Sequence, residues 1–203
     1  MNYIKPFALR LVLAASTLAA GTVQAESNNG TLFTGTTRLA CEALLCLSSS
    51  VGSSIAECQP SLSHYFGITR KTFSETLKAR LSFLQQCPVA SQTPAMAALV
   101  HAIAYGAGRC DAASLNSTLQ TYRVDARGRG HLEIADTPPG YCSAYTQHAY
   151  TDLQAITPKY VGKPEDGGYW VEPGQYDAEL IKYQAALEER KKNQALDDHY
   201  SSW

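Results

Sequence analysis

The chain has 203 residues, of which 45% are hydrophobic and 17% are charged, and its formal net charge is −1 at pH 7. This balance is too weak to predict binding to nucleic acid or to an anionic membrane surface. The length suits one domain of ordinary size that buries a real hydrophobic core.

The first 25 residues have the pattern of a secretory signal peptide. A basic start precedes the apolar run "LVLAASTLAAG", and Val23 and Ala25 place small residues just before a cut at Glu26. A membrane anchor is the rival, but a span needs about 18–20 apolar residues. We expect removal of residues 1–25, which leaves 15 basic and 18 acidic residues, a net charge of −3, and no transmembrane segment.

Helical patterns dominate from residue 37 to residue 122, after a polar and flexible lead-in at 26–36. Leu39, Ala43 and Leu47 recur at helical spacing, and the serine-rich "SSSVGSS" ends that helix. Side chains that cap helices at their amino ends are predicted at three positions: Thr72, which is followed by Glu75 as in a capping box, Thr93 and Asp111.

Strand patterns follow residue 122. The segments "YRVDARGRGHLEIAD" and "KYVGKPEDGGYWVEP" each predict a β-hairpin. From Pro173 an amphipathic helix is predicted, which frays into a solvated tail from Glu188. One face of this helix carries Tyr176, Leu180, Tyr183 and Leu187. The predicted fold is mainly α: a disulfide-stapled helical domain at 37–172, with one or two short β-hairpins in its C-terminal half, and a C-terminal amphipathic helix and tail at 173–203.

Six cysteines follow the signal peptide: Cys41, Cys46, Cys58, Cys87, Cys110 and Cys142. An even number in an exported chain predicts disulfides, because an oxidising compartment preserves them. Two of them, five positions apart on one helix, point about 140° apart and so reach different neighbours. The sequence alone does not choose among the possible pairings. The preferred pairs are Cys46–Cys58, Cys41–Cys87 and Cys110–Cys142. A zinc site and a reactive thiol are the alternatives, although no CxxC pair is present.

No catalytic, cofactor-binding or metal-ligating residue is predicted. The sequence lacks the HExxH, GxSxG, GxGxxG and phosphate-loop patterns. His131 and Glu133 alternate on a predicted strand and suit a two-ligand metal site or an acid–base pair, but a solvated hairpin face is the preferred interpretation. His101 lies among small apolar residues and is interpreted as a core or rim histidine.

Two further features leave function open. A peptidoglycan-cleaving enzyme needs a positioned carboxylate in a cleft, and Glu42 and Glu57 are the candidates. Twelve tyrosines, several of them late in the chain, suit either packing of the C-terminal half or contacts with partner proteins. Packing is the preferred interpretation. Asn116 begins an "NST" glycosylation pattern, which has little meaning in a bacterial protein.

The segments "LACEALLCLSSS", "ECQPSLSHYFGI", "TLKARLSFLQQCP", "VHAIAYGAGRCDAASLN", "PGYCSAY" and "KYVGKPEDGGYWV" resemble the TrbM family, also called KikA, of bacterial conjugal transfer proteins. The resemblance runs from about Arg38 to Val171. Some family members carry a cysteine-containing insertion before "PGYC", where this chain has the short "VDARGRGHLEIAD". If that insertion carries partner specificity, this member differs in its partners.

The resemblance implies a role in plasmid conjugation, a location in the periplasm, and protein partners in the mating-pair formation apparatus, a type IV secretion system. It brings no catalytic residue or cofactor. The first hypothesis is therefore a non-enzymatic accessory protein that binds components of this envelope-spanning apparatus. The alternatives are a peptidoglycan-active enzyme that assists channel assembly and an exported killing or exclusion factor.

Overall fold

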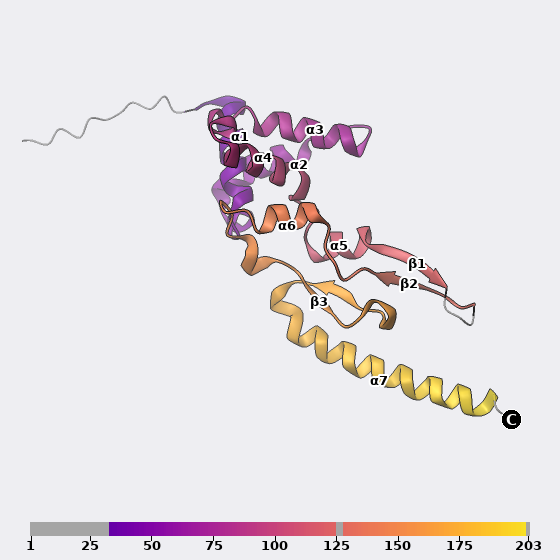
Figure 1. Cartoon of the computed structure of the whole chain (residues 1–203). Coiled ribbons are helices and arrows are strands. Elements are labelled where there is room, and N and C mark those ends of the chain that lie inside the picture. The colour runs from indigo at the N-terminus through magenta and orange to yellow at the C-terminus, as the bar shows by residue number, and fades with distance from the viewer. Residues whose placement is uncertain (1–32, 125–127, 202–203) are drawn as a thin grey trace, which may run out of the picture. The chain divides into compact units, whose positions relative to one another are not determined.

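The computed structural model describes residues 33–124 and 128–201, so the predicted signal peptide lies outside the described part (Figure 1). The α-helices of this part are α1 (Gly35–Ser48), α2 (Gln59–Gly67), α3 (Phe73–Leu84), α4 (Pro94–Gly106), α5 (Ala112–Thr118), α6 (Gly140–Thr146) and α7 (Tyr176–Ser201). The strands are β1 (Gln120–Val124), β2 (Gly130–Ile134), β3 (Lys159–Val161) and β4 (Tyr169–Val171). This arrangement confirms the predicted mainly α fold with two short hairpins and a C-terminal helix. Within the described ranges, no helix has both the length and the apolar character of a membrane span.

The main hydrophobic core lies among α1, α2, α3 and α4, and α6 packs against α4. On α1 the buried residues fall every three or four positions, which confirms the predicted helical spacing. They are Ala40, Ala43, Leu44, Cys46 and Leu47. The small alanines let neighbouring helices approach α1 closely, and the leucines fill the space between them.

Side-chain caps start three of the helices, as predicted. Thr72 and Glu75 form a capping box on α3, in which each side chain accepts the backbone N–H of the other residue at 3.2 Å. Thr93 Oγ1 accepts a backbone N–H at 3.1 Å at the start of α4, and Asp111 Oδ1 does so at 2.8 Å for α5. Each bond satisfies an amide that has no partner within the first helical turn.

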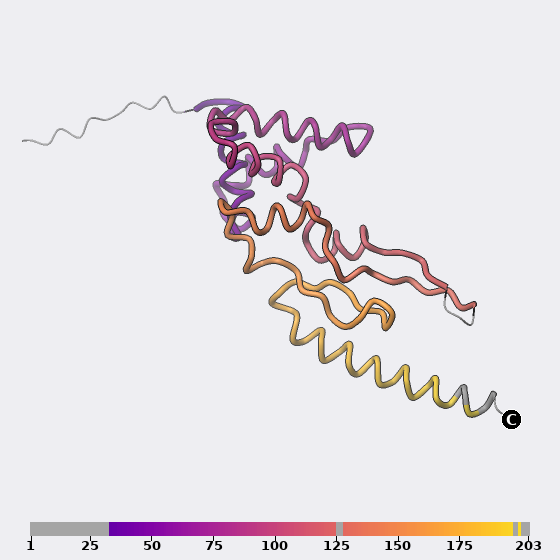
Figure 2. Tube along the Cα trace, viewed as in Figure 1, coloured from indigo at the N-terminus to yellow at the C-terminus, as the bar shows by residue number. Residues whose placement is uncertain are grey.

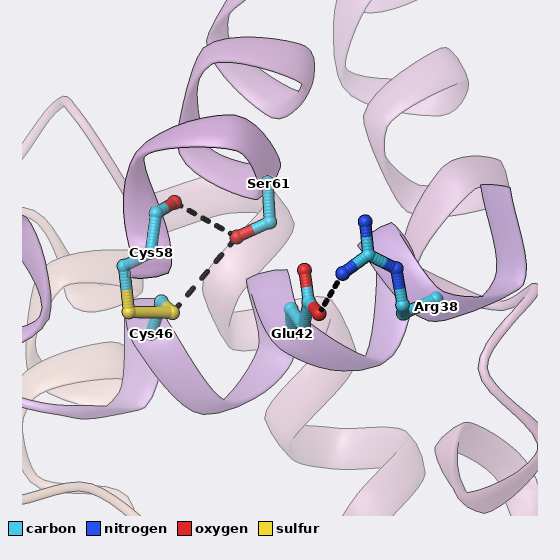
Figure 3. A network of polar contacts seen from close by, with 5 residues as sticks. All are labelled: Arg38, Glu42, Cys46, Cys58 and Ser61. Atoms are coloured by element: carbon cyan, nitrogen blue, oxygen red, sulfur yellow. Dashed lines mark hydrogen bonds and ion pairs between the residues drawn. A yellow bond between two sulfur atoms is a disulfide. The ribbon is translucent and has the colours of Figure 1, made fainter. Parts of the chain in front are cut away.

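Three disulfides connect the helices: Cys41–Cys87, Cys46–Cys58 and Cys110–Cys142. The first two leave different faces of α1, as the five-residue spacing predicts. One reaches the turn after α3, and the other reaches the residue just before α2 (Figure 3). The third joins the turn after α4 to α6. These are the three pairs preferred from the sequence, and none of the described cysteines is free.

The two hairpins pair antiparallel, β1 with β2 and β3 with β4, and along the trace α6 lies between them and α7 follows the second (Figure 2). Trp170 of β4 is buried with Leu115 of α5 and the Cys110–Cys142 disulfide. Its indole N–H donates to the carbonyl of Ala135, just after β2, at 2.9 Å. The Trp170 side chain therefore helps to hold the second hairpin against α5 and the first hairpin.

The first half of α7 packs on the second hairpin. The predicted apolar face of α7 packs against buried residues of β3 and β4, which confirms this prediction. The face consists of Tyr176, Leu180, Tyr183 and Leu187. Gly162 follows β3 with φ +83°, and the Tyr183 ring lies within 2.2 Å of the place that a Cβ would take. Only glycine fits this position, because both the backbone angle and the space exclude a side chain.

The second half of α7 differs from the prediction. The sequence predicts a frayed tail from Glu188, but the helix continues to Ser201. From Glu188 to Leu196 the side chains are exposed, and an ion pair joins Lys191 to Glu188 at 3.0 Å across one helical turn. Residues with high helix propensity and such pairs support a helix that is largely exposed to solvent.

Two buried tyrosines should make the stability of the fold depend on pH in the alkaline range. Tyr65 donates to the carbonyl of Ile103 at 3.2 Å, and Tyr145 donates to the carbonyl of Leu47. Burial raises the pKa of Tyr65 to about 12, against an opposing effect of Arg80, and burial also raises the pKa of Tyr145.

The pKa of each tyrosine is higher in the folded protein than in the unfolded chain. The stabilisation that the protonated hydroxyls give is therefore fully present below pH 10 and is lost as pH rises through 12. We expect the free energy of unfolding to fall over this range by up to about 3 kcal/mol for Tyr65 alone. Denaturant unfolding between pH 8 and pH 12 measures the slope. The Tyr65→Phe and Tyr145→Phe double variant should have a flatter slope, and an equal slope in both proteins would contradict this assignment.

Candidate interaction surface

His131 and Glu133, which were the alternative candidates for a metal site or an acid–base pair, lie together on β2, where the His131 Nε2 and Glu133 Oε1 atoms are 2.9 Å apart. Arg123 of β1 also approaches Glu133, at 3.6 Å. The pair lies in an open cavity of about 870 Å³ between the first hairpin, the turn of the second hairpin and α7. Arg190 and Lys191 of α7 add basic groups to its wall. The pair is therefore part of a solvated hairpin face with mixed charge, and the described residues hold no cluster of three or more possible metal ligands.

The two candidate carboxylates of the enzyme hypothesis lie apart from the cavities. Glu42 forms an ion pair with Arg38 at 3.0 Å along α1, one turn before Cys46 (Figure 3). Glu57 is exposed in the turn before α2. Neither residue lines the open cavity or the two smaller cavities of about 280 and 70 Å³. His101 is exposed on α4, at the rim of the helical half and not in its core.

Two arginines and four aromatic residues from four helices and one turn meet on one surface of the helical half. We call it the arginine–aromatic surface, and its members are Phe66, Phe73, Arg80, Tyr105, Arg109 and Tyr141. Phe66 lies in the last turn of α2, and two members lie on α3. The others lie at the end of α4, in the turn that follows it, and at the start of α6. The segments are far apart in the sequence but are joined by helix packing.

Arg109 is the centre of this surface. Its guanidinium carbon lies 4.4 Å from the ring centre of Phe73 and 4.0 Å from that of Tyr141. The guanidinium is therefore in contact with two aromatic rings, an arrangement that stabilises the cation without neutralising it. Its Nη1 group donates to the carbonyl of Tyr105 at 2.9 Å.

The third disulfide fixes this stack. Cys110 follows Arg109 and Cys142 follows Tyr141, so the bond between the two cysteines holds the arginine and the tyrosine side by side. Gly108 precedes them with φ +73°, and the Phe66 ring lies 2.8 Å from the place of a Cβ there. A glycine at this position lets the turn after α4 pass close to α2.

Arg80 extends the surface along α3. It donates from Nη2 to the carbonyl of Phe66 at 3.2 Å, and its guanidinium lies 5.0 Å from the Tyr65 ring centre and 5.6 Å from that of Phe66. Its Nε atom and the Tyr141 hydroxyl are buried without a hydrogen-bond partner. Arg80 therefore has one buried donor that no other group accepts.

The segment that carries most of the surface is basic. Between Ile68 and Asp111 the sequence holds five basic residues and two acidic residues, a net charge of +3 in a chain whose total is −1. The basic residues are Arg70, Lys71, Lys78, Arg80 and Arg109. The acidic residues are Glu75 and Asp111, whose side chains cap α3 and α5. Among the described residues, no carboxylate forms an ion pair with Arg80 or Arg109.

Sequence reasoning missed this surface, although the segments that it singled out contain all of its members except Phe73. "SLSHYFGI" supplies Phe66, "TLKARLSFLQQCP" supplies Arg80, "VHAIAYGAGRCDAASLN" supplies Tyr105 and Arg109, and "PGYC" supplies Tyr141. One signal was available in the sequence: Arg109 directly precedes Cys110, and Tyr141 directly precedes Cys142, the preferred partner of Cys110. The preferred interpretation of the tyrosines as packing residues fits Tyr145 and Tyr183, which are buried.

These features define a disulfide-stapled, mainly helical protein with a rigid arginine–aromatic surface. The chain belongs to the TrbM family, whose characteristic sequence it matches over residues 32–184. Membership associates the chain with conjugal transfer, as the resemblance implied. Neither the curated proteins nor the solved structures gave a significant match to this chain.

Proposed function

We propose that this protein is a periplasmic accessory protein of plasmid conjugation that acts by binding protein components of the mating-pair formation apparatus, a type IV secretion system. It works through contact and performs no catalysis. The match to the TrbM family supports the process. The signal-peptide pattern and three disulfides support the compartment, because disulfides form and persist in the oxidising periplasm.

The arginine–aromatic surface is the observation that carries the binding role. Arginine and aromatic residues are the side chains most enriched at the energetic centres of protein interfaces. Here they are exposed in part, with Phe73 at 55% and Tyr105 at 43%. The Cys110–Cys142 disulfide holds the stack in place before any partner arrives, so little side-chain freedom remains to be lost on binding.

A transfer assay tests the proposed function. Cells that lack the gene for this chain should transfer the plasmid less often, and the full-length chain should restore transfer. A chain that starts at Glu26 should not restore it, because it stays in the cytoplasm where its disulfides do not form. Undiminished transfer without the gene, or full restoration by the chain without residues 1–25, would disprove the proposal.

A surface variant refines this test. We expect Arg109→Glu to lower transfer at least about tenfold, which corresponds to about 1.4 kcal/mol of lost binding. Lys192→Glu on the exposed part of α7 makes the same charge change away from the surface and should transfer normally. Equal amounts of oxidised protein in periplasmic extracts must accompany both results, so that a folding defect is separated from a binding defect.

A further inference from the structure

We infer that the arginine–aromatic surface binds an acidic segment of a partner protein, and that a carboxylate of this segment meets the guanidinium edge of Arg109. This inference rests on the proposed function, because it names the chemistry of the partner that the surface takes. It also makes a separate prediction for the purified protein.

The state of Arg109 is the first argument. A guanidinium has five N–H donors, and only the bond to the Tyr105 carbonyl is made here. The rings of Phe73 and Tyr141 lie against this group, with their centres 4.4 and 4.0 Å from its central carbon, and Arg109 is partly exposed. A carboxylate can accept two parallel hydrogen bonds from the edge of a guanidinium, which a compact ammonium group cannot offer.

The absence of an internal counter-charge is the second argument. Arg38, Arg123, Lys182 and Lys191 each have a carboxylate within 4 Å, whereas the two arginines of the surface have none among the described residues. The segment from Ile68 to Asp111 adds to this imbalance with its net charge of +3. Opposite charge on the partner would speed encounter and favour the correct partner over neutral ones.

The exposed rings give the third argument. Phe73, Tyr105 and Phe66 are 55%, 43% and 40% exposed, so a bound segment can cover apolar area next to its salt bridge. A small inorganic anion would leave these rings in water. A flat membrane would gain less, because two of these rings, those of Phe66 and Phe73, lie against the guanidinium groups of Arg80 and Arg109. A polypeptide that mixes Asp or Glu with apolar side chains satisfies both requirements.

Two matched peptides test the inference on the full oxidised chain from residue 26 onward. One alternates Asp or Glu with Phe or Leu, and the other replaces each acid with its amide. At low ionic strength we expect the acidic peptide to bind at least about tenfold more tightly than the amide peptide. We expect Arg109→Met to remove this preference, Arg109→Lys to retain part of it, and Lys192→Met to leave it intact.

A residue-specific signal separates binding at the surface from general attraction. The Arg109 Nε–H resonance should shift as the acidic peptide is added, and thermal unfolding should show that each variant remains folded. Equal affinity for the two peptides, or a preference that survives Arg109→Met, would overturn the inference. Tighter binding to phosphatidylglycerol vesicles would assign the surface to a membrane instead, and self-association lost in Arg109→Met would assign it to a second copy.

The two tests fail independently. If the unmodified protein binds the two peptides equally but Arg109→Glu still lowers transfer, the acidic partner is disproved and the proposed function stands. Selective peptide binding with normal transfer in the absence of the gene would disprove the proposed function and keep the binding chemistry.

Discussion

Replacing both cysteines of the Cys41–Cys87 bond with alanine is expected to lower the free energy of unfolding by about 4 kcal/mol. This bond closes the longest of the three loops, with a sequence separation of 46 residues, and therefore removes the most freedom from the unfolded chain. Cys87 is also fully buried in the main core, so replacing it with the smaller alanine removes packing contacts there.

The other disulfides provide the matched controls. Cys46–Cys58 has a separation of 12 residues and should cost about 3 kcal/mol when it is removed. Cys110–Cys142, with a separation of 32, should lie between the two. Denaturant unfolding of the three double variants, each with its other disulfides intact, measures this order. A larger loss for Cys46–Cys58 than for Cys41–Cys87 would show that loop length does not control the effect.

Asn116→Ala is expected to destabilise the C-terminal half by about 2–4 kcal/mol. The Asn116 side chain imitates a neighbouring strand: its Oδ1 accepts the Trp170 N–H at 2.7 Å, and its Nδ2 donates to the Trp170 carbonyl at 2.8 Å. Truncation leaves both backbone groups of a buried residue without a partner. Asn116→Asp should also destabilise, because a carboxylate cannot donate and would face the Trp170 carbonyl.

Chemical unfolding and Trp170 fluorescence measure this effect. Asn193→Ala on the exposed half of α7 is the control and should change stability by less than about 0.5 kcal/mol. A similarly small change for Asn116→Ala would mean that the two hydrogen bonds contribute little. The result also explains the "NST" pattern, because the asparagine that begins it is a structural residue whose amide is already bonded.

Much of the fold was predictable because the signals are local. The spacing of Leu39, Ala43 and Leu47 places apolar residues on one face of a helix, and a face of this kind becomes buried wherever the helix packs. The capping box of Thr72 and Glu75 acts within four residues, so its chemistry does not depend on tertiary structure. Two of the disulfide pairs could be preferred because Cys46 and Cys58 flank a short serine-rich loop and Cys87 lies at the end of the next predicted helix.

The end of α7 was predicted incorrectly for a related reason. Mixed charge and few apolar residues after Glu188 predict a solvated segment, and the exposed side chains agree. Exposure, however, does not decide between a frayed chain and a helix. High helix propensity and the Lys191–Glu188 pair favour the helix once its first half is fixed by packing of Tyr183.

The sequence by itself determined the helices, their caps, the two hairpins and the family, because each depends on residues close together in the chain. Only the tertiary structure decided that Arg109 stands between Phe73 and Tyr141 and that Asn116 bonds to Trp170. These partners lie 32 to 54 positions apart, and no local pattern records which distant side chains will meet. The physical reason is that helix packing and the Cys110–Cys142 bond, not spacing along the chain, bring them together.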